Sequence, residues 1–151
     1  MTHKTDVVIR PLDRADKPQW AALWGAYLAF YETSRPSEVY DIYFERLLSD
    51  DPNDYYCLLA EVDDQIVGLT HYLFHRHGWF VENVCYLQDL YAVPEVRGLG
   101  VGRALIEAVY AAADKAGAPS VYWLTQDFNK TARKLYDRIG VQTPFIKYKR
   151  K

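Results

Sequence analysis

Apolar side chains recur along this chain with two different periods, and each period predicts one kind of element. Where they return every three or four residues, as in the aromatic stripe from Trp20 to Tyr31, the spacing is typical of a helix with one buried face. Gly117 and Gly140 stand just beyond two such stretches, where helices commonly end. The pattern predicts helices over residues 18–31, 37–48, 101–116 and 130–139.

Apolar runs bounded by turn residues predict the strands. Asp63 and Asp64 make a tight turn between two such runs, so we expect these runs to pair as an antiparallel hairpin. The predicted strands cover residues 6–10, 55–62, 66–74, 79–92, 121–125 and 144–149. The order β-α-α-β-β-β-α-β-α-β indicates an α/β (α+β) fold, in which helices flank a mixed, mostly antiparallel central sheet.

The composition is that of an ordinary globular protein, so we expect residues 1–151 to form a single domain. The net charge is −2 and no basic stripe is present, which argues against a general affinity for nucleic acid. No apolar run approaches the roughly 20 residues of a membrane span, and the N-terminus has no secretory signal. Cys57 and Cys85 lie in apolar runs and form no CxxC pair. We therefore expect a cytoplasmic protein with neither a nucleic-acid nor a membrane partner.

The segment RGLGVGR, from Arg97 to Arg103, carries the clearest chemical signal. Its alternating glycines precede a predicted helix and leave backbone N–H groups uncovered, which favours a phosphate or pyrophosphate ligand. Both arginines would add charge-assisted hydrogen bonds to the same anion. A Walker loop fails because position 103 is Arg and no Ser or Thr follows it. A dinucleotide-binding loop is disfavoured because the spacing is GxGxG and an antiparallel meander precedes it. A glycine-rich turn without a ligand is the alternative at this point.

Arg97, Gly100 and Gly102 form the pattern RxxGxG, which resembles the acetyl-CoA pyrophosphate motif of the GNAT superfamily. Residues 88–94, QDLYAVP, resemble the central strand of that superfamily, and residues 129–140 resemble its second cofactor motif. The resemblance covers nearly the whole chain. It is closest to the histone or D-amino-acid acetyltransferase branch, and the segment from residue 86 to 91 is also similar to the spermidine/spermine branch.

The resemblance implies a GNAT fold and an N-acetyltransferase, an acyltransferase that moves the acetyl group of acetyl-CoA directly to an amine in a ternary complex. It implies that the backbone at Leu90 and Ala92 pairs with the pantetheine, and that the Leu90 N–H polarises the thioester carbonyl. Tyr136 would protonate the departing thiolate, unless it is a core residue of its helix. The implied cofactor-binding residues are Leu90, Tyr91, Ala92, Arg97, Gly98, Leu99, Gly100, Val101, Gly102, Arg103, Asn129, Ala132 and Tyr136.

The proton acceptor for the substrate ammonium is left open by the residues. Polyamine acetyltransferases carry Glu where this chain has Gln88, and an amide can position a water but cannot accept a proton. Asp89 is a candidate base or substrate anchor, or a carboxylate that caps backbone groups near a strand bulge. Further candidate bases are Glu82, Glu32 and Tyr86, and proton loss to bulk water is another route. The predicted catalytic residues are Tyr136, Gln88 and Asp89, and the predicted substrate-binding residues are Glu32, His77 and Asp89.

Three histidines, His71, His75 and His77, share strand parity, but no acidic or Cys partner has matching spacing, so we expect no metal. We expect the acceptor to be a small-molecule amine or amino acid, because His75-Arg76-His77 would make a positive mouth that disfavours polyamines. The alternatives are a protein (histone-like) lysine or polyamine acetyltransferase, with a peptide amine as substrate in the first case, and a non-catalytic acyl-CoA-binding module. The aromatic content of 15% and the alternating aromatic and basic residues near the C-terminus favour a homodimer.

Overall fold

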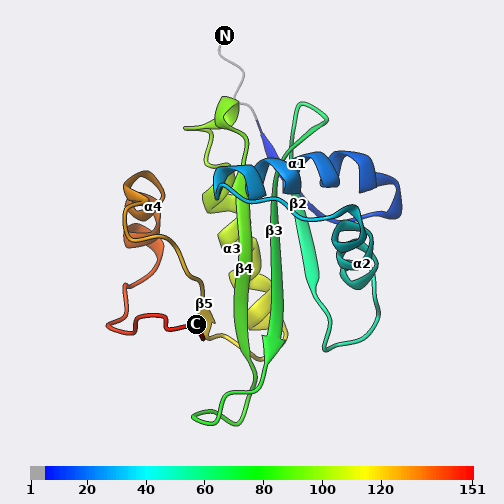
Figure 1. The fold of residues 1–151 in the computed structure, drawn as a ribbon. Coiled ribbons are helices and arrows are strands. Elements are labelled where there is room, and N and C mark those ends of the chain that lie inside the picture. Colours follow the sequence, from blue (N-terminus) through cyan, green and yellow to red (C-terminus); the bar gives the residue numbers. More distant parts are fainter. Residues whose placement is uncertain (1–5) are drawn as a thin grey trace.

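The computed structural model describes residues 6–151, whose strands form a five-stranded sheet with helices on both faces (Figure 1). The strand order is β1-β2-β3-β4-β5; the first four strands are antiparallel, and β5 is parallel to β4. This is the mixed, mostly antiparallel sheet that the sequence predicts. The strands are β1 (Val7–Pro11), β2 (Tyr56–Val62), β3 (Gln65–His75), β4 (Val84–Ala92) and β5 (Val121–Tyr122). The helices are α1 (Lys17–Phe30), α2 (Ser37–Leu47), α3 (Val101–Lys115) and α4 (Lys130–Ile139), with 3-10 turns η1 (Arg14–Asp16) and η2 (Pro94–Val96).

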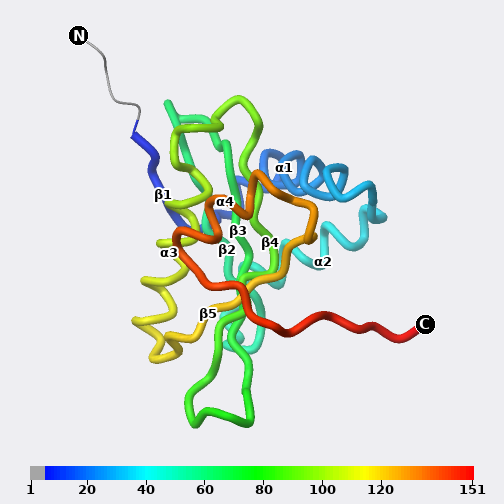
Figure 2. The backbone as a smooth tube through the Cα atoms, turned by 90° about the vertical axis from the view of Figure 1, so that its left-hand side faces the viewer, coloured from blue at the N-terminus to red at the C-terminus, as the bar shows by residue number. Residues whose placement is uncertain are grey.

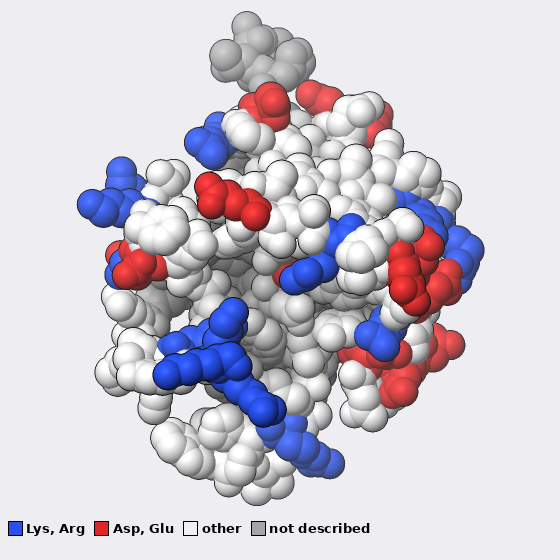
Figure 3. All heavy atoms as spheres, viewed as in Figure 1, with Lys and Arg blue, Asp and Glu red and all other residues white. Residues whose placement is uncertain are grey.

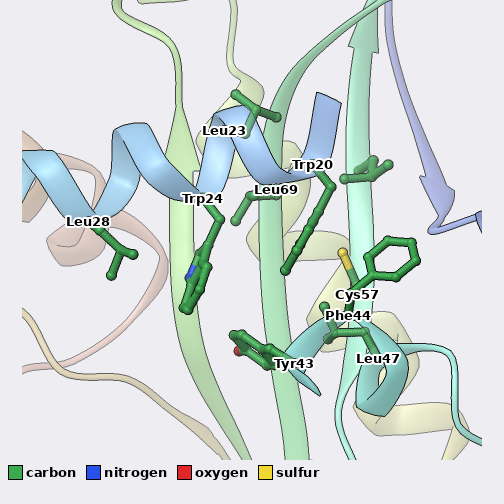
Figure 4. Close-up of a cluster of buried hydrophobic side chains, with 10 residues drawn as sticks. Trp20, Leu23, Trp24, Leu28, Tyr43, Phe44, Leu47, Cys57 and Leu69 are labelled. Carbon is green, nitrogen blue, oxygen red and sulfur yellow. The ribbon is translucent and has the colours of Figure 1, made fainter. Parts of the chain in front are cut away.

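Helices cover the two faces of the sheet unequally. α1 and α2 lie across one face and α3 lies across the other, while α4 packs against α3 beyond β4 (Figure 1). On the α1 and α2 face, Trp20, Phe44 and Leu69 are fully buried in an aromatic core (Figure 4). Burying a large apolar side chain stabilises the fold by about 1.5–3 kcal/mol. The aromatic stripe of α1 is therefore the structural anchor of this face.

A β-bulge in β4 exchanges the faces of the sheet to which the side chains of its second half point. His71 pairs with Asp89 while Tyr72 pairs with Leu87, so Gln88 is an extra residue with no partner on β3. Before the bulge, Cys85 and Leu87 face the α3 side of the sheet. Without the extra residue Asp89 would follow them, because strand side chains alternate with a period of two. The bulge instead directs Asp89 toward α1 and α2, where Tyr43 reaches it.

Strand β4 also has an open outer edge. β5 pairs with it only at Cys85 and Tyr86, and beyond these residues no described strand pairs with that edge. The Cys85 N–H donates toward β5, to Ser120, whereas the Val93 N–H donates toward β3, to Val67. Because N–H groups alternate along a strand, those of Leu90 and Ala92 point to the open edge. Two extended-backbone donors are thus directed where no strand of the described protein accepts them.

The predicted strand over 144–149 is absent. β5 consists of two residues, so this side of the sheet offers a returning segment almost no edge to pair with. The segment runs out from the sheet on the side of α1 and α2 (Figure 2), and its Phe145, Ile146 and Tyr148 side chains are 75%, 78% and 88% exposed. The sequence pattern is that of a strand, but the described residues of this chain do not bury it.

Two further strand predictions were too long. The strand expected from Trp79 begins at Val84, because residues 76–83 form the tip of the β3–β4 hairpin, with the Phe80 N–H bonded back to His77. The strand expected over 121–125 ends at Tyr122, where the chain leaves β4. Cys57 and Cys85 are buried free thiols, as predicted.

Candidate active site

The glycine loop between β4 and α3 has the backbone conformation that its sequence predicts. Gly98 and Gly100 have φ of 85° and 78°, in the left-handed region that costs other residues about 1–2 kcal/mol. α3 begins directly afterwards at Val101, and no side chain caps its first turn. The N–H groups of that first turn have no intrahelical acceptors, so they form a cradle of donors for an anion.

Gly68 on β3 holds this cradle close to β4. A Cβ atom at Gly68 would lie 2.9 Å from Val101 Cγ1, closer than real Cβ atoms approach, and 3.1 Å from the Tyr91 carbonyl oxygen, which is an unusually tight contact. The absence of a side chain there lets the first turn of α3 lie against the sheet beside the C-terminal end of β4. The donor cradle and the open strand edge are therefore neighbours.

The two arginines of the loop lie at the surface. Arg97 is exposed, and the Arg103 Nε donates to the Glu107 carboxylate at 2.8 Å. Exposed pairs of this kind contribute little, typically about 0.3–0.5 kcal/mol, so Arg103 can exchange Glu107 for a phosphate at small cost. Both guanidinium groups are available to an anion held at the loop.

Helix α4 carries the second group of predicted cofactor-binding residues. Asn129 stands at its N-cap, and its amide donates to Thr125 at 3.3 Å; Ala132 follows on the helix, partly buried. Tyr136 is half-buried against Trp123, and burial together with the nearby Tyr31 raises the pKa of the Tyr136 phenol to about 12. The phenol therefore keeps its proton at neutral pH and can donate a hydrogen bond.

Asp89 is a buried carboxylate, only 5% exposed. Its Oδ2 accepts hydrogen bonds from the Tyr43 hydroxyl at 2.8 Å and from His71 Nδ1 at 2.7 Å. Burial alone would raise the pKa of Asp89, but His71, Tyr43 and Tyr27 favour the ionised form and leave this pKa below its ordinary value. The carboxylate is therefore ionised at neutral pH, and Oδ1 takes part in neither of these two hydrogen bonds.

Three phenols complete the surroundings of Asp89. Burial raises the pKa values of Tyr27 and Tyr31, on α1 and its C-cap, and the charge of Asp89 raises both further. The pKa of Tyr86 is raised by burial, by Tyr122 and by Asp89. Tyr31 also raises the pKa of Tyr136 on α4. Sequence reasoning placed Tyr27 and Tyr31 in the aromatic stripe without a role in the site; their i and i+4 spacing toward the end of that helix was the available signal.

Residues 20–141 match the acetyltransferase (GNAT) family, and the glycine loop, the open β4 edge and α4 all lie within this range. This chain belongs to the acetyltransferase (GNAT) family. The D-amino-acid N-acetyltransferase HPA3 of Saccharomyces cerevisiae is 37% identical to it over 145 residues, which are 95% of this chain and 90% of that protein. The thialysine N-epsilon-acetyltransferase of Bos taurus is 35% identical over 96 residues, 58% of this chain and 56% of that protein. The chain is thus an N-acetyltransferase, as its sequence motifs predict.

The fold agrees with that assignment. The aminoglycoside N-acetyltransferase AAC(6')-Iy, solved in complex with CoA, superposes with a TM-score of 0.82 at 18% identity, over 100% of this chain and 98% of that one. At this level of identity the likeness concerns the fold alone. It places the acetyltransferase within the GNAT architecture that the resemblance of its motifs implies.

The remaining site residues predicted for this acetyltransferase are dispersed. Gln88 is exposed in the bulge next to Asp89, and Glu32 is exposed directly after Tyr31 with a left-handed φ of 58°. Glu82 and His77 lie on the exposed hairpin tip beyond the end of the sheet (Figure 1). The structure brings Gln88 next to Asp89 and places Glu32 directly after the C-cap of α1, but it does not bring Glu82 or His77 to the carboxylate.

The two histidines of β3 and His77 of the hairpin tip have separate surroundings in this GNAT protein. His71 is buried beside Asp89, while His75 bonds to the Tyr122 hydroxyl at 2.7 Å and His77 Nδ1 accepts from the Trp79 N–H at 3.1 Å. Within residues 6–151, no three His, Cys, Asp or Glu side chains are grouped so as to hold a metal ion. None of the helices over the same residues is both long and apolar enough to cross a membrane.

Proposed function

We propose that this protein acetylates the primary amine of a small molecule or an amino acid, with acetyl-CoA as the acyl donor in a ternary complex. The observation that carries the proposal is the ionised, buried carboxylate of Asp89, set where the open β4 edge, the phenols of α1 and Tyr136 of α4 converge. The proposal treats residues 1–151 as one cytoplasmic acetyltransferase domain.

The residues present fit acetyl-CoA. The first turn of α3 and the left-handed Gly98 and Gly100 offer uncovered N–H groups to a pyrophosphate, and Leu90 and Ala92 offer theirs to an extended pantetheine arm. Bound acetyl-CoA supplies an activated acyl group. The Leu90 N–H, directed to the open edge, would polarise the thioester carbonyl and stabilise negative charge on its oxygen.

Asp89 fits the role of an anchor better than that of a base. Its pKa lies below the ordinary value of about 3.9, whereas an alkylammonium has a pKa of about 10.4. Transfer of the proton from the ammonium to Asp89 would therefore be strongly uphill. A carboxylate that remains ionised can instead accept a hydrogen bond from the amine before and after the amine loses its proton. Water is then the proton acceptor, one of the routes that the sequence left open.

Tyr136 fits the role of a hydrogen-bond donor to the departing thiolate. With a pKa of about 12, against about 8.5 for a cysteine-like thiol, complete transfer of its proton would be uphill by about 5 kcal/mol. A hydrogen bond from the phenol stabilises the developing charge without that transfer. The proposal therefore keeps Tyr136 at the leaving group and assigns it stabilisation of charge.

A small acceptor is favoured by the number of carboxylates. Asp89 is the buried carboxylate of the site, and a long polyamine would need further acidic groups along the cleft. The positive mouth expected from the sequence adds no support, because the hairpin tip that carries Arg76 and His77 lies beyond the end of the sheet (Figure 1), whereas Asp89 lies within β4. The names of the relatives, which include a D-amino-acid N-acetyltransferase and a thialysine N-epsilon-acetyltransferase, support a small amino acid.

The experiment that tests this function follows thiol release from acetyl-CoA with D- and L-amino acids, thialysine, spermine and a basic peptide in one buffer. The proposal expects a specificity constant for at least one amino acid that exceeds those of spermine and the peptide by tenfold or more. Turnover led by the peptide would favour a protein lysine acetyltransferase. Binding of acetyl-CoA without turnover of any amine would favour a non-catalytic acyl-CoA-binding module.

We also propose that the protein is a homodimer formed through the segment that follows α4. Phe145 and Ile146 are followed by Tyr148 between two lysines along an extended, exposed segment, and basic side chains gather over this part of the surface (Figure 3). This exposed segment has a strand-like sequence, so it could pair with the edge of the sheet in a second copy of the protein. The proposal is tested by the molar mass in solution, as described in the Discussion.

A further inference from the structure

The aromatic core between α1 and the sheet contains two polar groups that bond to each other. Trp20 and His71 are both 0% exposed, and the Trp20 indole Nε1–H donates to His71 Nε2 at 2.9 Å. On its other side, His71 Nδ1 lies 2.7 Å from Asp89 Oδ2. A polar group buried in an apolar core costs free energy unless it has a hydrogen-bond partner. Here Trp20 is hydrogen-bonded to His71, and His71 is hydrogen-bonded to Asp89.

The geometry fixes the protonation state of His71. An indole N–H can only donate, so His71 Nε2 must accept and carries no proton. The ring proton is therefore on Nδ1, and it is donated to Asp89 Oδ2. His71 is a neutral imidazole, and the negative charge of the chain Trp20–His71–Asp89 stays on the carboxylate.

We propose that Trp20 and His71 are positioning residues for the amine acceptor. Together with the Tyr43 hydroxyl they hold Oδ2 of Asp89 with two donors and keep the carboxylate in one orientation. The amine would then be received at the carboxylate beside the Tyr27 hydroxyl, which also interacts with Asp89. The inference rests on the proposed role of Asp89 as the amine anchor. It assigns a function to the first aromatic residue of α1, which the sequence pattern identifies only as core.

The side chains that surround the hydrogen-bonded series Trp20–His71–Asp89 come from every helix and strand packed against it. His71 faces Trp20 of α1, Tyr43 of α2 and Asp89 of β4, and it pairs with Cys57 on β2. Burial raises the pKa values of the Tyr43 phenol and the Cys57 thiol, so both keep their protons at neutral pH. Around Asp89, the raised pKa values of Tyr27, Tyr31 and Tyr86 have the same consequence. Asp89 is thus the only one of these side chains that carries a charge at neutral pH.

The first experiment measures the tautomer of His71 by long-range 1H–15N NMR in the full-length protein. We expect the proton on Nδ1 and none on Nε2, as the two hydrogen bonds require. Trp20→Phe removes the donor to Nε2, so the ring should no longer be restricted to this one tautomer. Trp24→Phe is the matched control: the Trp24 ring stacks on Trp20 with centroids 5.7 Å apart, and its buried indole N–H has no partner among the described residues. A wild-type His71 with its proton on Nε2 or on both nitrogens, or a Trp20→Phe variant that keeps the wild-type tautomer unchanged, would overturn the inference.

The second experiment separates the two nitrogens of His71 by their effect on the amine KM. His71→Asn places an amide donor at the position of Nδ1 and preserves the bond to Asp89, whereas His71→Gln places its amide at the position of Nε2 and loses that bond. We expect the amine KM to stay within about threefold in His71→Asn and to rise tenfold or more in His71→Gln, with the acetyl-CoA KM unchanged in both. A purely structural role predicts the opposite order, because Asn leaves the larger cavity. Should no amine be acetylated, the proposed function fails, while the NMR result still decides the state of His71.

Discussion

Gly100 is the position where one added methyl group tests the cofactor cradle most cleanly. Its φ is 78°, and an added Cβ would meet no atom within 4 Å. Gly117, just past the end of α3, has a φ of 72° and equally open surroundings, so it is a matched control at the other end of the same helix. Gly100→Ala and Gly117→Ala should each destabilise the protein by about 1–2 kcal/mol, the cost of a left-handed conformation for Ala. For a chain of this length, that lowers Tm by about 2–8 °C.

The two variants should differ in acetyl-CoA affinity. At Gly100 the Cβ projects from the loop where the pyrophosphate must approach the backbone, or else the backbone leaves the left-handed region and redirects its N–H groups. Losing one hydrogen bond to a charged ligand costs about 1.5–3 kcal/mol, so the dissociation constant should rise about 10- to 150-fold. Gly117 is at the opposite end of α3, and its substitution should leave the dissociation constant unchanged.

Titration calorimetry with acetyl-CoA at 25 °C and thermal unfolding of both variants make the comparison. The expected result is similar losses of Tm with a selective loss of affinity in Gly100→Ala. An affinity within threefold of wild type in Gly100→Ala would show that this loop is not the cradle. Equal losses of affinity in both variants would show that the binding defect follows stability rather than local geometry.

Three further predictions concern the leaving group, the acidic side chains and the assembly. Tyr136→Phe should lower kcat about 5- to 150-fold, the loss expected for a hydrogen bond of about 1–3 kcal/mol to a developing charge, with acetyl-CoA affinity unchanged; an unchanged kcat would remove the phenol from the mechanism. The pKa values of Asp16, which is paired with Arg10 at 2.8 Å, and of Asp89 are both lowered, so their stabilising contributions are complete above about pH 3.9 and are lost as the pH falls below it. Tm should therefore be flat from pH 5 to 8 and fall below pH 4, and Asp16→Asn should lower Tm at pH 7 without changing kcat; a Tm that is already falling at pH 6 would contradict this assignment. Light scattering at micromolar concentration should give the mass of a dimer, and removal of residues 144–151 should give a monomer; a monomeric full-length chain would refute the homodimer.

The helices were the most predictable part of the fold. Residues 130–139 form a helix with the predicted bounds, and the helix predicted over 37–48 ends one residue earlier, at Leu47. Helical periodicity is a local property that a short stretch of sequence carries by itself. The strand predicted over 144–149 failed because a strand exists only where another strand offers an edge, and β5 offers two residues. An alternating pattern indicates that a segment can form a strand, but it does not indicate whether a partner strand is present.

The candidate site divides in the same way. The glycine loop and Tyr136 lie in short motifs, so the sequence points to both of them directly. The hydrogen bonds that link Trp20, His71 and Asp89 join residues far apart in the sequence: Trp20 and His71 are 51 positions apart, and His71 and Asp89 are 18 positions apart. It depends on the β3–β4 register and on the bulge at Gln88, which turns Asp89 to the α1 face. A sequence pattern does not specify that one-residue insertion, although it did mark Asp89 as a candidate anchor.

The most direct test of the central claim is a competition assay read by mass spectrometry. Wild-type protein and Asp89→Asn are each incubated with acetyl-CoA and an equimolar mixture of D- and L-amino acids, spermine and a basic peptide, and the acetylated products are quantified. The account predicts that an acetylated amino acid is the main product of the wild type, and that Asp89→Asn forms at least tenfold less of it while binding acetyl-CoA with unchanged affinity. Equal product from the two proteins, or acetylated spermine or peptide as the main wild-type product, would contradict the account.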